Sequence, residues 1–341
     1  MTNETGTAAQ PLRDEKILIT GPAGRVAFPV AEALARDNAV WGIARFGTAG
    51  ERERVEAAGI RTRRIDLARP EWSDLPEDFT LVLHFAAAIG TGLSFAEAVR
   101  INGVGTGALM HRHRRARACL VASSRAVYAE PEDPDRLQHE DDPLGGNAPL
   151  PYAPTYRVSK LSQEAVAQFW AEELGLPTII ARLNVVYGDN GGLPAMLLER
   201  MKAGEPIPLG PHGATRAGPI HHEDLVAQLP GLLAGAGVPA VIVNWAGDEP
   251  VSMRAMCAYM GELTGLTPRF VVTEAVSGNR PMDPARRLAL TGPCRMDWRV
   301  GIRRMIERMP GIEPRPSPSS SGAGPRRDPA APATGERQSS S

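Results

Sequence analysis

The chain has 341 residues with 38 basic and 39 acidic side chains, so its formal net charge is −1 at pH 7. This near balance excludes a general attraction for nucleic acid or for an anionic membrane surface. We expect a cytoplasmic globular protein with no nucleic-acid or membrane partner.

The two ends of the chain differ in composition from the rest. Residues 1–14 are small and polar without periodicity, and residues 313–341 are dominated by Pro, Ser and Gly. Such segments bury too little apolar surface to offset the entropy of ordering, so both are predicted to be disordered. The C-terminal segment could tether a partner, although a dispensable extension is the favoured interpretation.

Between the ends, short apolar runs alternate with helix-length stretches. Strands are predicted at 16–20, 39–45, 61–65, 80–85, 118–123, 178–186 and 241–245, and helices at 26–36, 96–111 and 156–174. This alternation indicates an α/β fold, a doubly wound parallel sheet of the Rossmann type covered on both faces. Residues 15–187 are expected to form mainly this domain. Residues 188–312, rich in Gly and Pro, are expected to form mainly a smaller substrate-binding region, with at least one strand returning to the sheet.

The first predicted strand runs directly into Gly21-Pro-Ala-Gly24-Arg-Val-Ala27, which is followed by a helical pattern. Glycine permits the tight turn and lets backbone N–H groups approach a pyrophosphate at the helix N-terminus, and Ala27 is small enough for close packing. A glycine-rich turn without a ligand is the alternative. The position between first strand and first helix favours an NAD(P) site.

Arg45 ends the second predicted strand, where an acidic residue would bond the ribose 2′-hydroxyl of NAD. An arginine at this point suits a 2′-phosphate, which favours NADP over NAD, and Arg25 could add to the same positive site. Alternatively, Arg45 stacks on the adenine, a role compatible with either cofactor.

Tyr156 and Lys160 lie four residues apart in a predicted helix, so their side chains share one face. A nearby positive charge favours the phenolate and lowers the pKa of a tyrosine. The pair could then transfer a proton to or from an alcohol or ketone. Taken alone, the pair is more simply explained as a surface contact on a helix, but the glycine loop upstream favours the catalytic interpretation.

With these motifs in order, residues 16–310 resemble the extended short-chain dehydrogenase/reductase family, the NAD(P)-dependent epimerase/dehydratase group. The matching segments are, in chain order, residues 20–27, 66–67, 83–87, 102, 123–128, 156–160 and 182–188. The resemblance implies cofactor contacts from the glycine loop, the strand ends and the catalytic segments. These residues are Gly21, Gly24, Arg25, Val26, Arg45, Asp66, Leu67, Phe85, Ala86, Ala87, Asn102, Ser123, Tyr156 and Lys160.

The resemblance also implies the catalytic roles. Ser124 would hydrogen-bond the substrate oxygen, Tyr156 would be the acid/base, and Lys160 would hold the nicotinamide ribose while lowering the tyrosine pKa. Ser123 would face the nicotinamide. Family members often dimerise through a four-helix interface that includes the tyrosine helix, so a homodimer is expected.

Two further positions bear on the substrate. Arg216 resembles the arginine that clamps the diphosphate of a nucleotide-sugar, since its planar fork bonds phosphate oxygens bidentately; the alternative is a surface ion pair. Asn184 is a substrate-binding candidate, but it lies one place earlier than the asparagine of many such enzymes, and Val185 occupies that place.

The reaction is narrowed by the residues after Ser124. Sugar-nucleotide dehydratases of this family place Asp-Glu there, whereas this chain has Arg125 and Ala126, which argues against a 4,6-dehydratase. A nucleotide-sugar epimerase is the leading hypothesis. An NADPH-dependent keto-reductase of a smaller carbonyl substrate is the alternative, and a non-catalytic dinucleotide-binding sensor is the alternative from another class.

A metal site is not expected. His221 and His222, followed by Glu223, have metal-binding side chains, but adjacent residues in an extended segment point to opposite sides and seldom converge.

Overall fold

The computed structural model describes residues 10–133, 135–146, 153–213, 215–276 and 281–312. Residues 1–9 and 313–341, which belong to the segments predicted to be disordered, lie outside the described residues. The rest of the N-terminal segment contacts the fold: Asn38 Nδ2 donates to Leu12 O at 3.0 Å, and Asp14 N donates to Asp37 O at 2.9 Å. These contacts tie residues 12–14 to the ordered part of the chain.

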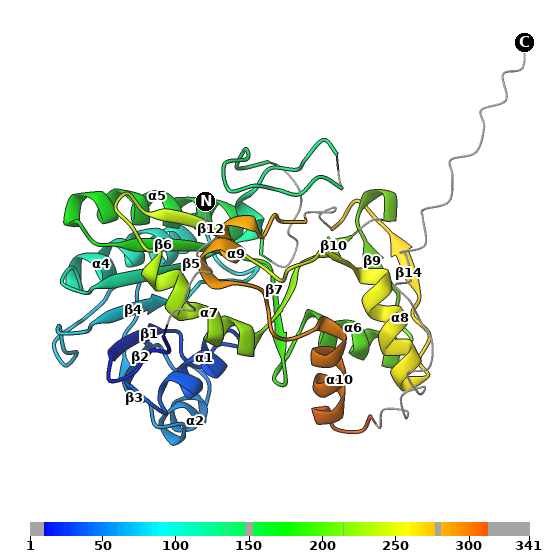
Figure 1. The fold of residues 1–341 in the computed structure, drawn as a ribbon, viewed down its shortest axis with the longest axis horizontal. Helices are drawn as coiled ribbons and strands as arrows, with labels where there is room; N and C mark the ends of the chain where they lie inside the picture. The colour runs from blue at the N-terminus through cyan, green and yellow to red at the C-terminus, as the bar shows by residue number, and fades with distance from the viewer. Residues whose placement is uncertain (1–9, 134, 147–152, 214, 277–280, 313–341) are drawn as a thin grey trace, which may run out of the picture.

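A seven-stranded parallel sheet forms the larger part of the fold (Figure 1). Its strands lie in the order β12-β6-β5-β4-β1-β2-β3, and every neighbouring pair is parallel. Their bounds are β1 Lys16–Thr20, β2 Ala39–Ala44, β3 Arg61–Arg64, β4 Leu81–His84, β5 Ala118–Ser124, β6 Thr178–Leu183 and β12 Val241–Trp245. The predicted doubly wound α/β class is confirmed.

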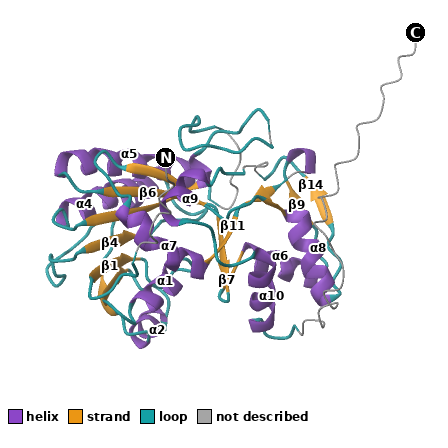
Figure 2. Cartoon of the chain, in the orientation of Figure 1, coloured by secondary structure: helices purple, strands orange, loops and turns teal. Residues whose placement is uncertain are grey.

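Helices cover both faces of this sheet (Figure 2). One face packs against α1 Ala27–Leu34, α2 Glu51–Ala57 and α7 His222–Ala234, and the other against α4 Gly105–Arg112 and α5 Tyr156–Leu174. Alternate residues of β1 pack on opposite faces of the sheet. Ile17 and Ile19 lie in the core on the face of α1, α2 and α7, and Leu18 lies in the core on the face of α4 and α5. Burial on both faces explains why the strands read as continuous apolar runs.

The helix predicted at 96–111 is interrupted. The structure has α3 Phe95–Val99, a π-helical turn η1 Arg100–Val104, and then α4. Two glycines let this turn approach its neighbours closely: a Cβ on Gly103 would meet Ser162 Oγ at 2.5 Å, and one on Gly105 would meet Leu67 O at 2.8 Å. Wide turns of this kind are frequent at functional sites.

The strand predicted at 178–186 is likewise divided. After β6 the chain bends at Asn184 and continues as β7 Val185–Gly188, which leaves the large sheet and pairs with β11 Pro219–His221 and β8 Gly191–Gly192. The bend carries the chain into the smaller region beside the sheet (Figure 1).

The smaller region packs short strands and helices around a core of its own. Its remaining elements are α6 Leu193–Lys202, β9 Ile207–Leu209, η3 Pro211–Gly213, β10 Arg216–Ala217, β13 Val251–Ser252, α8 Met253–Thr264, β14 Phe270–Val272 and α10 Trp298–Arg308. A short helix, η2 Arg125–Val127, follows β5, and α9 Ala285–Thr291 packs against α7. No helix among the described residues has the length and apolar character needed to cross a membrane.

Candidate functional site

The glycine loop joins β1 to α1 and contacts the ends of two other strands. Gly21 has a φ of +67°, its N–H donates to Ile43 O at 2.8 Å, and a Cβ added to it would meet Ala86 Cα at 3.1 Å. The left-handed conformation and the close approach both require glycine. Gly24 N closes the turn on Gly21 O at 2.9 Å.

The N-terminus of α1 is suited to a phosphate. Its N-cap residue, Val26, makes no side-chain cap, and the first turn has no acidic residue. The first N–H groups of a helix lack intrahelical partners and carry partial positive charge, so they favour an anion. The structure thus fits the dinucleotide that the sequence predicts.

Two side chains from distant elements fix the glycine loop. Arg54 of α2 donates to Ala23 O at 2.7 Å, and Asn190 donates to Arg25 O at 2.8 Å. Neither contact is predicted from the sequence, because both partners are far from the loop along the chain. Arg45 lies just after β2 and is exposed.

The next predicted cofactor contacts follow β3 and β4. Asp66 is exposed, and its carboxylate accepts from Ala68 N at 2.9 Å, whereas Leu67 is 7% exposed and packs in the core. Phe85, Ala86 and Ala87 are half-buried. Leu67 is therefore held as a core residue, with its backbone beside Gly105.

Asn102, in the π turn, connects this region with α5. Its Oδ1 accepts from Ala88 N at 2.7 Å, and its Nδ2 donates to Ala88 O at 3.2 Å and to Ser159 Oγ at 2.8 Å. The side chain is 1% exposed. In the structure Asn102 fixes the loop that follows β4; its predicted contact with the cofactor stays a prediction.

Tyr156 and Lys160 open α5 and lie together, with Lys160 Nζ 5.8 Å from the centroid of the Tyr156 ring. Lys160 Nζ also donates to Ala122 O at 2.8 Å, two residues before Ser124. Ser124 ends β5, where its Oγ accepts from Ala126 N at 3.2 Å. The carboxyl end of β5 thus brings the three predicted catalytic residues into one region.

Burial has a large effect on Lys160. The side chain is 2% exposed, and loss of hydration lowers the pKa of its ammonium to about 7, with the nearby Glu164 carboxylate acting in the opposite direction. Acceptors that contact the Lys160 ammonium therefore oppose the effect of burial and favour its charged form.

Ser123 faces α5 and points into the interior. It is 2% exposed, and its hydroxyl donates to Glu164, which also accepts from Arg182 Nε at 3.0 Å and Nη2 at 2.8 Å. Successive residues of a strand point to opposite faces, so Ser123 and Ser124 diverge. The structure gives Ser123 a place in a buried ion-pair network, and its predicted contact with the nicotinamide stays a prediction.

Arg157, directly after Tyr156, was not predicted as a site residue. It is 6% exposed, and its guanidinium donates to Ala126 O at 2.8 Å and to Gly146 O. It therefore holds the short helix that follows Ser124.

The two predicted substrate contacts lie in segments that meet at Gly218. Arg216 is half-buried in β10, with Nη1 3.5 Å from the Asp135 carboxylate, so the ion pair considered as the alternative is present. Asn184 Oδ1 accepts from Val185 N at 2.9 Å, and its buried Nδ2 has no hydrogen-bond partner among the described residues. Nδ2 lies beside Gly218, which follows Arg216 by two residues.

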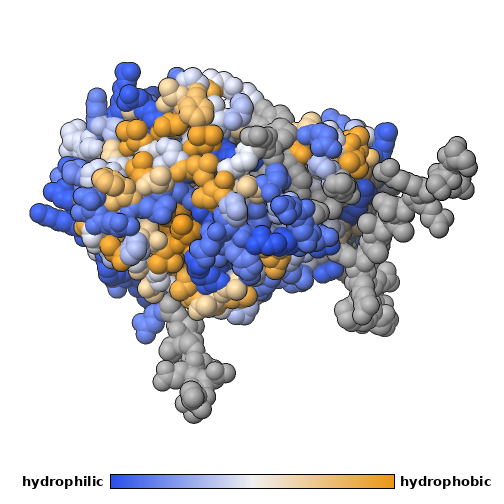
Figure 3. Space-filling view, turned by 90° about the horizontal axis from the view of Figure 1, so that it is seen from above, coloured by the Kyte–Doolittle hydropathy of each residue, from blue (hydrophilic) through white to orange (hydrophobic). Residues whose placement is uncertain are grey.

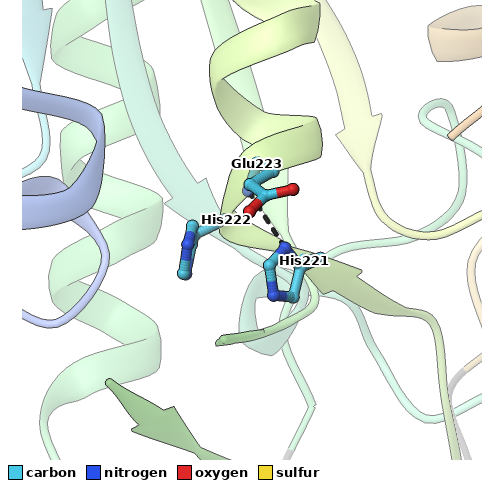
Figure 4. A group of neighbouring side chains, drawn as sticks. All are labelled: His221, His222 and Glu223. Carbon is cyan, nitrogen blue, oxygen red and sulfur yellow. Dashed lines mark hydrogen bonds between the residues drawn. The ribbon is translucent and has the colours of Figure 1, made fainter. Parts of the chain in front are cut away.

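His221, His222 and Glu223 lie together, contrary to the expectation that the two histidines point to opposite sides (Figure 4). The strand β11 ends at His221 and α7 begins at His222, so the chain turns between them, and the ring centroids are 4.3 Å apart. His221 Nδ1 accepts from Glu223 N at 3.2 Å, and the Glu223 oxygens accept from Arg304 at 2.7 and 3.2 Å. The Glu223 carboxylate is thus already paired with the Arg304 guanidinium.

The sheet, the glycine loop and the residues at the end of β5 define a doubly wound protein with a dinucleotide-binding loop. Residues 17–234 match the NAD dependent epimerase/dehydratase family, and the chain belongs to this family. The resemblance identified from the sequence is confirmed.

Curated relatives and solved structures agree with this membership. The trifunctional UDP-glucose 4,6-dehydratase/UDP-4-keto-6-deoxy-D-glucose 3,5-epimerase/UDP-4-keto-L-rhamnose-reductase RHM3 of Arabidopsis thaliana is 25% identical over 86% of this chain and 47% of its own length. The dTDP-L-rhamnose 4-epimerase of Burkholderia thailandensis is 30% identical over 52% of this chain and 60% of its own. This chain thus spans about half the length of these two relatives.

Two further comparisons cover more of the matched protein. The 3-diazoavenalumate denitrifying reductase of a Streptomyces species is 29% identical over 74% of this chain and 83% of its own length. The structure of MoeE5 in complex with UDP-glucose and NAD has a TM-score of 0.71 and 25% identity, covering 86% of this chain and 98% of that chain.

Proposed function

We propose that the protein is an NAD(P)-dependent epimerase of a nucleotide-sugar that works through Ser124, Tyr156 and Lys160. The observation that carries this proposal is the position of Lys160 Nζ, 2.8 Å from Ala122 O at the end of β5 and 5.8 Å from the Tyr156 ring centroid. The Tyr156–Lys160 pair and the Ser124 hydroxyl lie at the carboxyl ends of parallel strands. Doubly wound folds bind their ligands at this edge of the sheet.

The proposed reaction removes a proton and a hydride from one alcohol group of the substrate. Tyr156 accepts the proton of the substrate hydroxyl while the hydrogen on the same carbon leaves as hydride, so a ketone forms. The bound dinucleotide supplies the acceptor and donor of that hydride. Ser124 hydrogen-bonds the reacting oxygen, and the Lys160 ammonium stabilises the phenolate. Return of the hydride to the opposite face of the carbonyl carbon, with the Tyr156 proton returned to the oxygen, completes an epimerisation.

A nucleotide-sugar is favoured by the region around Arg216, in the part of the chain (residues 188–312) that we propose forms mainly the substrate-binding region. A diphosphate could replace Asp135 as the partner of the Arg216 guanidinium, whose fork matches phosphate oxygens. The unpartnered Nδ2 of Asn184 offers a donor nearby. Relatives are named for UDP- and dTDP-sugars.

A 4,6-dehydratase is disfavoured even though the family includes such enzymes. Elimination needs acid/base groups beside the catalytic hydroxyl, and Arg125 and the buried Ala126 lack a group that titrates near neutral pH. A keto-reductase is the second candidate, favoured by Val185 in place of asparagine and by the similarity to a Streptomyces reductase.

Cofactor stoichiometry separates the two candidates. For an epimerase, each enzyme-bound dinucleotide should serve many turnovers, because the cofactor returns to its oxidised form each time. One NADPH consumed per product would instead establish the reductase. Tight dinucleotide binding without turnover on a broad panel of nucleotide-sugars and ketones would favour a sensor.

We predict a preference for NADP over NAD. Arg45 follows β2, whose Ile43 carbonyl bonds Gly21, and no carboxylate occupies this place to bond a ribose hydroxyl. Arg45→Asp should lower NADPH affinity by about ten- to a hundredfold, the value of one or two charge-assisted contacts, and spare NADH. Titration of both cofactors checks this.

Arg36→Asp is the matched control for the cofactor titration. It introduces the same change at an exposed arginine next to the other end of α1 and should leave both affinities unaltered. Equal or tighter binding of NADH by the unaltered protein would contradict the preference.

We also propose a homodimer formed through the outer face of α5. Val158, Ala165 and Phe169 are exposed at helical spacing on this helix, with Phe169 56% exposed, and Phe95 of the neighbouring α3 is 55% exposed. Figure 3 looks down from the side of α5 and shows apolar side chains gathered on this part of the surface. Such a patch is typical of a protein interface.

The dimer is checked by light scattering. The unaltered protein should have twice the mass of the chain, and Phe169→Glu should yield a folded monomer because a carboxylate would be buried without a partner. Glu172→Gln, an exposed change on the same helix, should keep the dimer. A monomeric unaltered protein at micromolar concentration would contradict the proposal.

A further inference from the structure

Lys160 is held in place by Gln163, which lies outside the Tyr156–Lys160 motif. Its ammonium donates to Ala122 O at 2.8 Å and to Gln163 Oε1 at 2.7 Å. Gln163 lies one turn further along α5 and is fully buried. A charge in such surroundings depends strongly on each acceptor, because bulk solvent does not reach a fully buried group.

The orientation of the Gln163 amide follows from its other partner. Gln163 Nε2 lies 3.1 Å from Thr106 Oγ1, and the Thr106 hydroxyl donates its only proton to Asn102 O at 2.6 Å. The Thr106 oxygen can therefore only accept from Gln163. This turns the NH₂ group toward Thr106 and leaves the carbonyl oxygen for Lys160.

The same reasoning extends to His84 of β4. His84 Nε2 lies 2.8 Å from Thr106 Oγ1 and must donate to it, so His84 Nδ1 accepts from the Thr20 hydroxyl at 2.7 Å. Burial lowers the pKa of His84 to about 3, so the ring is neutral. Thr20 Oγ1 in turn accepts from Ala86 N at 2.9 Å.

We propose that Gln163 is a positioning residue for Lys160: its carbonyl holds the ammonium in place and sets the pH at which Lys160 loses its charge. Through Thr106 and His84, Gln163 also connects Lys160 with the loop after β4. The proposal rests on the proposed function, in which the Lys160 charge stabilises the Tyr156 phenolate and holds the nicotinamide ribose.

Three other ionisable groups lie around Lys160. His84 of β4 is neutral, and the Glu164 carboxylate of α5 is paired with Arg182 of β6. Tyr156 of α5 is the proton-transfer partner itself. The elements that carry Ala122 and Thr106 contribute neutral acceptors. Gln163 is thus the contact at which a substitution can shift the Lys160 pKa without altering an existing charge.

The test uses the full chain and two variants of matched shape. Gln163→Met removes the acceptor, and Gln163→Glu replaces it with a carboxylate. The pH dependence of dinucleotide affinity is measured by titration, together with the pH dependence of kcat. Both should decline as the pH rises through the pKa of Lys160 and the ammonium loses its proton.

The two variants should shift this decline in opposite directions. Gln163→Met disfavours the ammonium, so the midpoint of the decline should fall by about one pH unit or more, the value of one buried charge-assisted hydrogen bond. Gln163→Glu favours the ammonium, so the midpoint should rise by a similar amount. The same changes at Gln168, which is half-buried and donates to Glu164 O, should leave the midpoint unchanged.

Thermal unfolding checks that both Gln163 variants are folded. The proposal would be overturned if the midpoints of both variants coincided with that of the unaltered protein. The affinity measurement needs no turnover. If the protein binds dinucleotide but converts no sugar, the proposed function fails while the shift in the binding midpoint still decides the role of Gln163.

Discussion

Replacing Tyr156 with phenylalanine should lower kcat by about 10²–10⁴-fold, the usual contribution of a positioned acid/base group. The phenolic oxygen is the atom that receives the substrate proton, and phenylalanine removes it while keeping the ring above which Lys160 Nζ lies. Dinucleotide affinity should change little. Steady-state kinetics and a cofactor titration on the same preparation measure the two effects separately.

Tyr259→Phe provides the matched control for this experiment. Tyr259 is half-buried in α8 and packs edge-on against Trp298, far along the chain from the end of β5. Loss of its hydroxyl should leave kcat intact. A Tyr156→Phe protein with full activity would show that another group moves the proton.

Replacing Arg182 with methionine should lower the free energy of unfolding by about 3–5 kcal/mol. Arg182 is 1% exposed and bonds both oxygens of Glu164, which is 3% exposed, so the substitution leaves a buried carboxylate without its cation. Urea denaturation measures the loss. The exposed pair Arg52–Glu56 is the control, since Arg52→Met should cost about 0–1 kcal/mol.

The double variant Arg182→Met/Glu164→Gln separates the buried charge from simple loss of packing. Removing both charges should recover much of the stability lost in the single variant, because no unpaired ion remains. If the free energy of unfolding of Arg182→Met were within about 1 kcal/mol of that of the unaltered protein, the stabilising role of the buried Arg182–Glu164 pair would be contradicted.

The sheet and the glycine loop could be predicted from the sequence because their signals are local. Each strand is a short run with covered faces, and β1 and β12 have the bounds predicted for them, as does α5, the helix of Tyr156. Gly21 is required by a turn formed within a few residues. Patterns of this range are present in the chain itself.

The features that were missed depend on contacts between distant segments. At the π turn that carries Asn102, Gly103 packs against α5, and Gly105 packs against Leu67 in the segment after β3. The contact of Arg54 with the glycine loop spans 31 residues, and that of Gln163 with Thr106 spans 57. The convergence of His221 and His222 depends on a strand ending between them, and element boundaries are poorly specified by sequence.

The most direct test of the account follows one hydrogen atom. A nucleotide-sugar carrying deuterium on the carbon that bears the reacting hydroxyl is incubated with the enzyme and its bound dinucleotide, and the product is examined by NMR and mass spectrometry. We predict an epimer that keeps its deuterium on that carbon, because the hydride leaves to the cofactor and returns. Exchange of the deuterium with solvent, or the absence of any epimer from a panel of labelled UDP- and dTDP-sugars, would contradict the account.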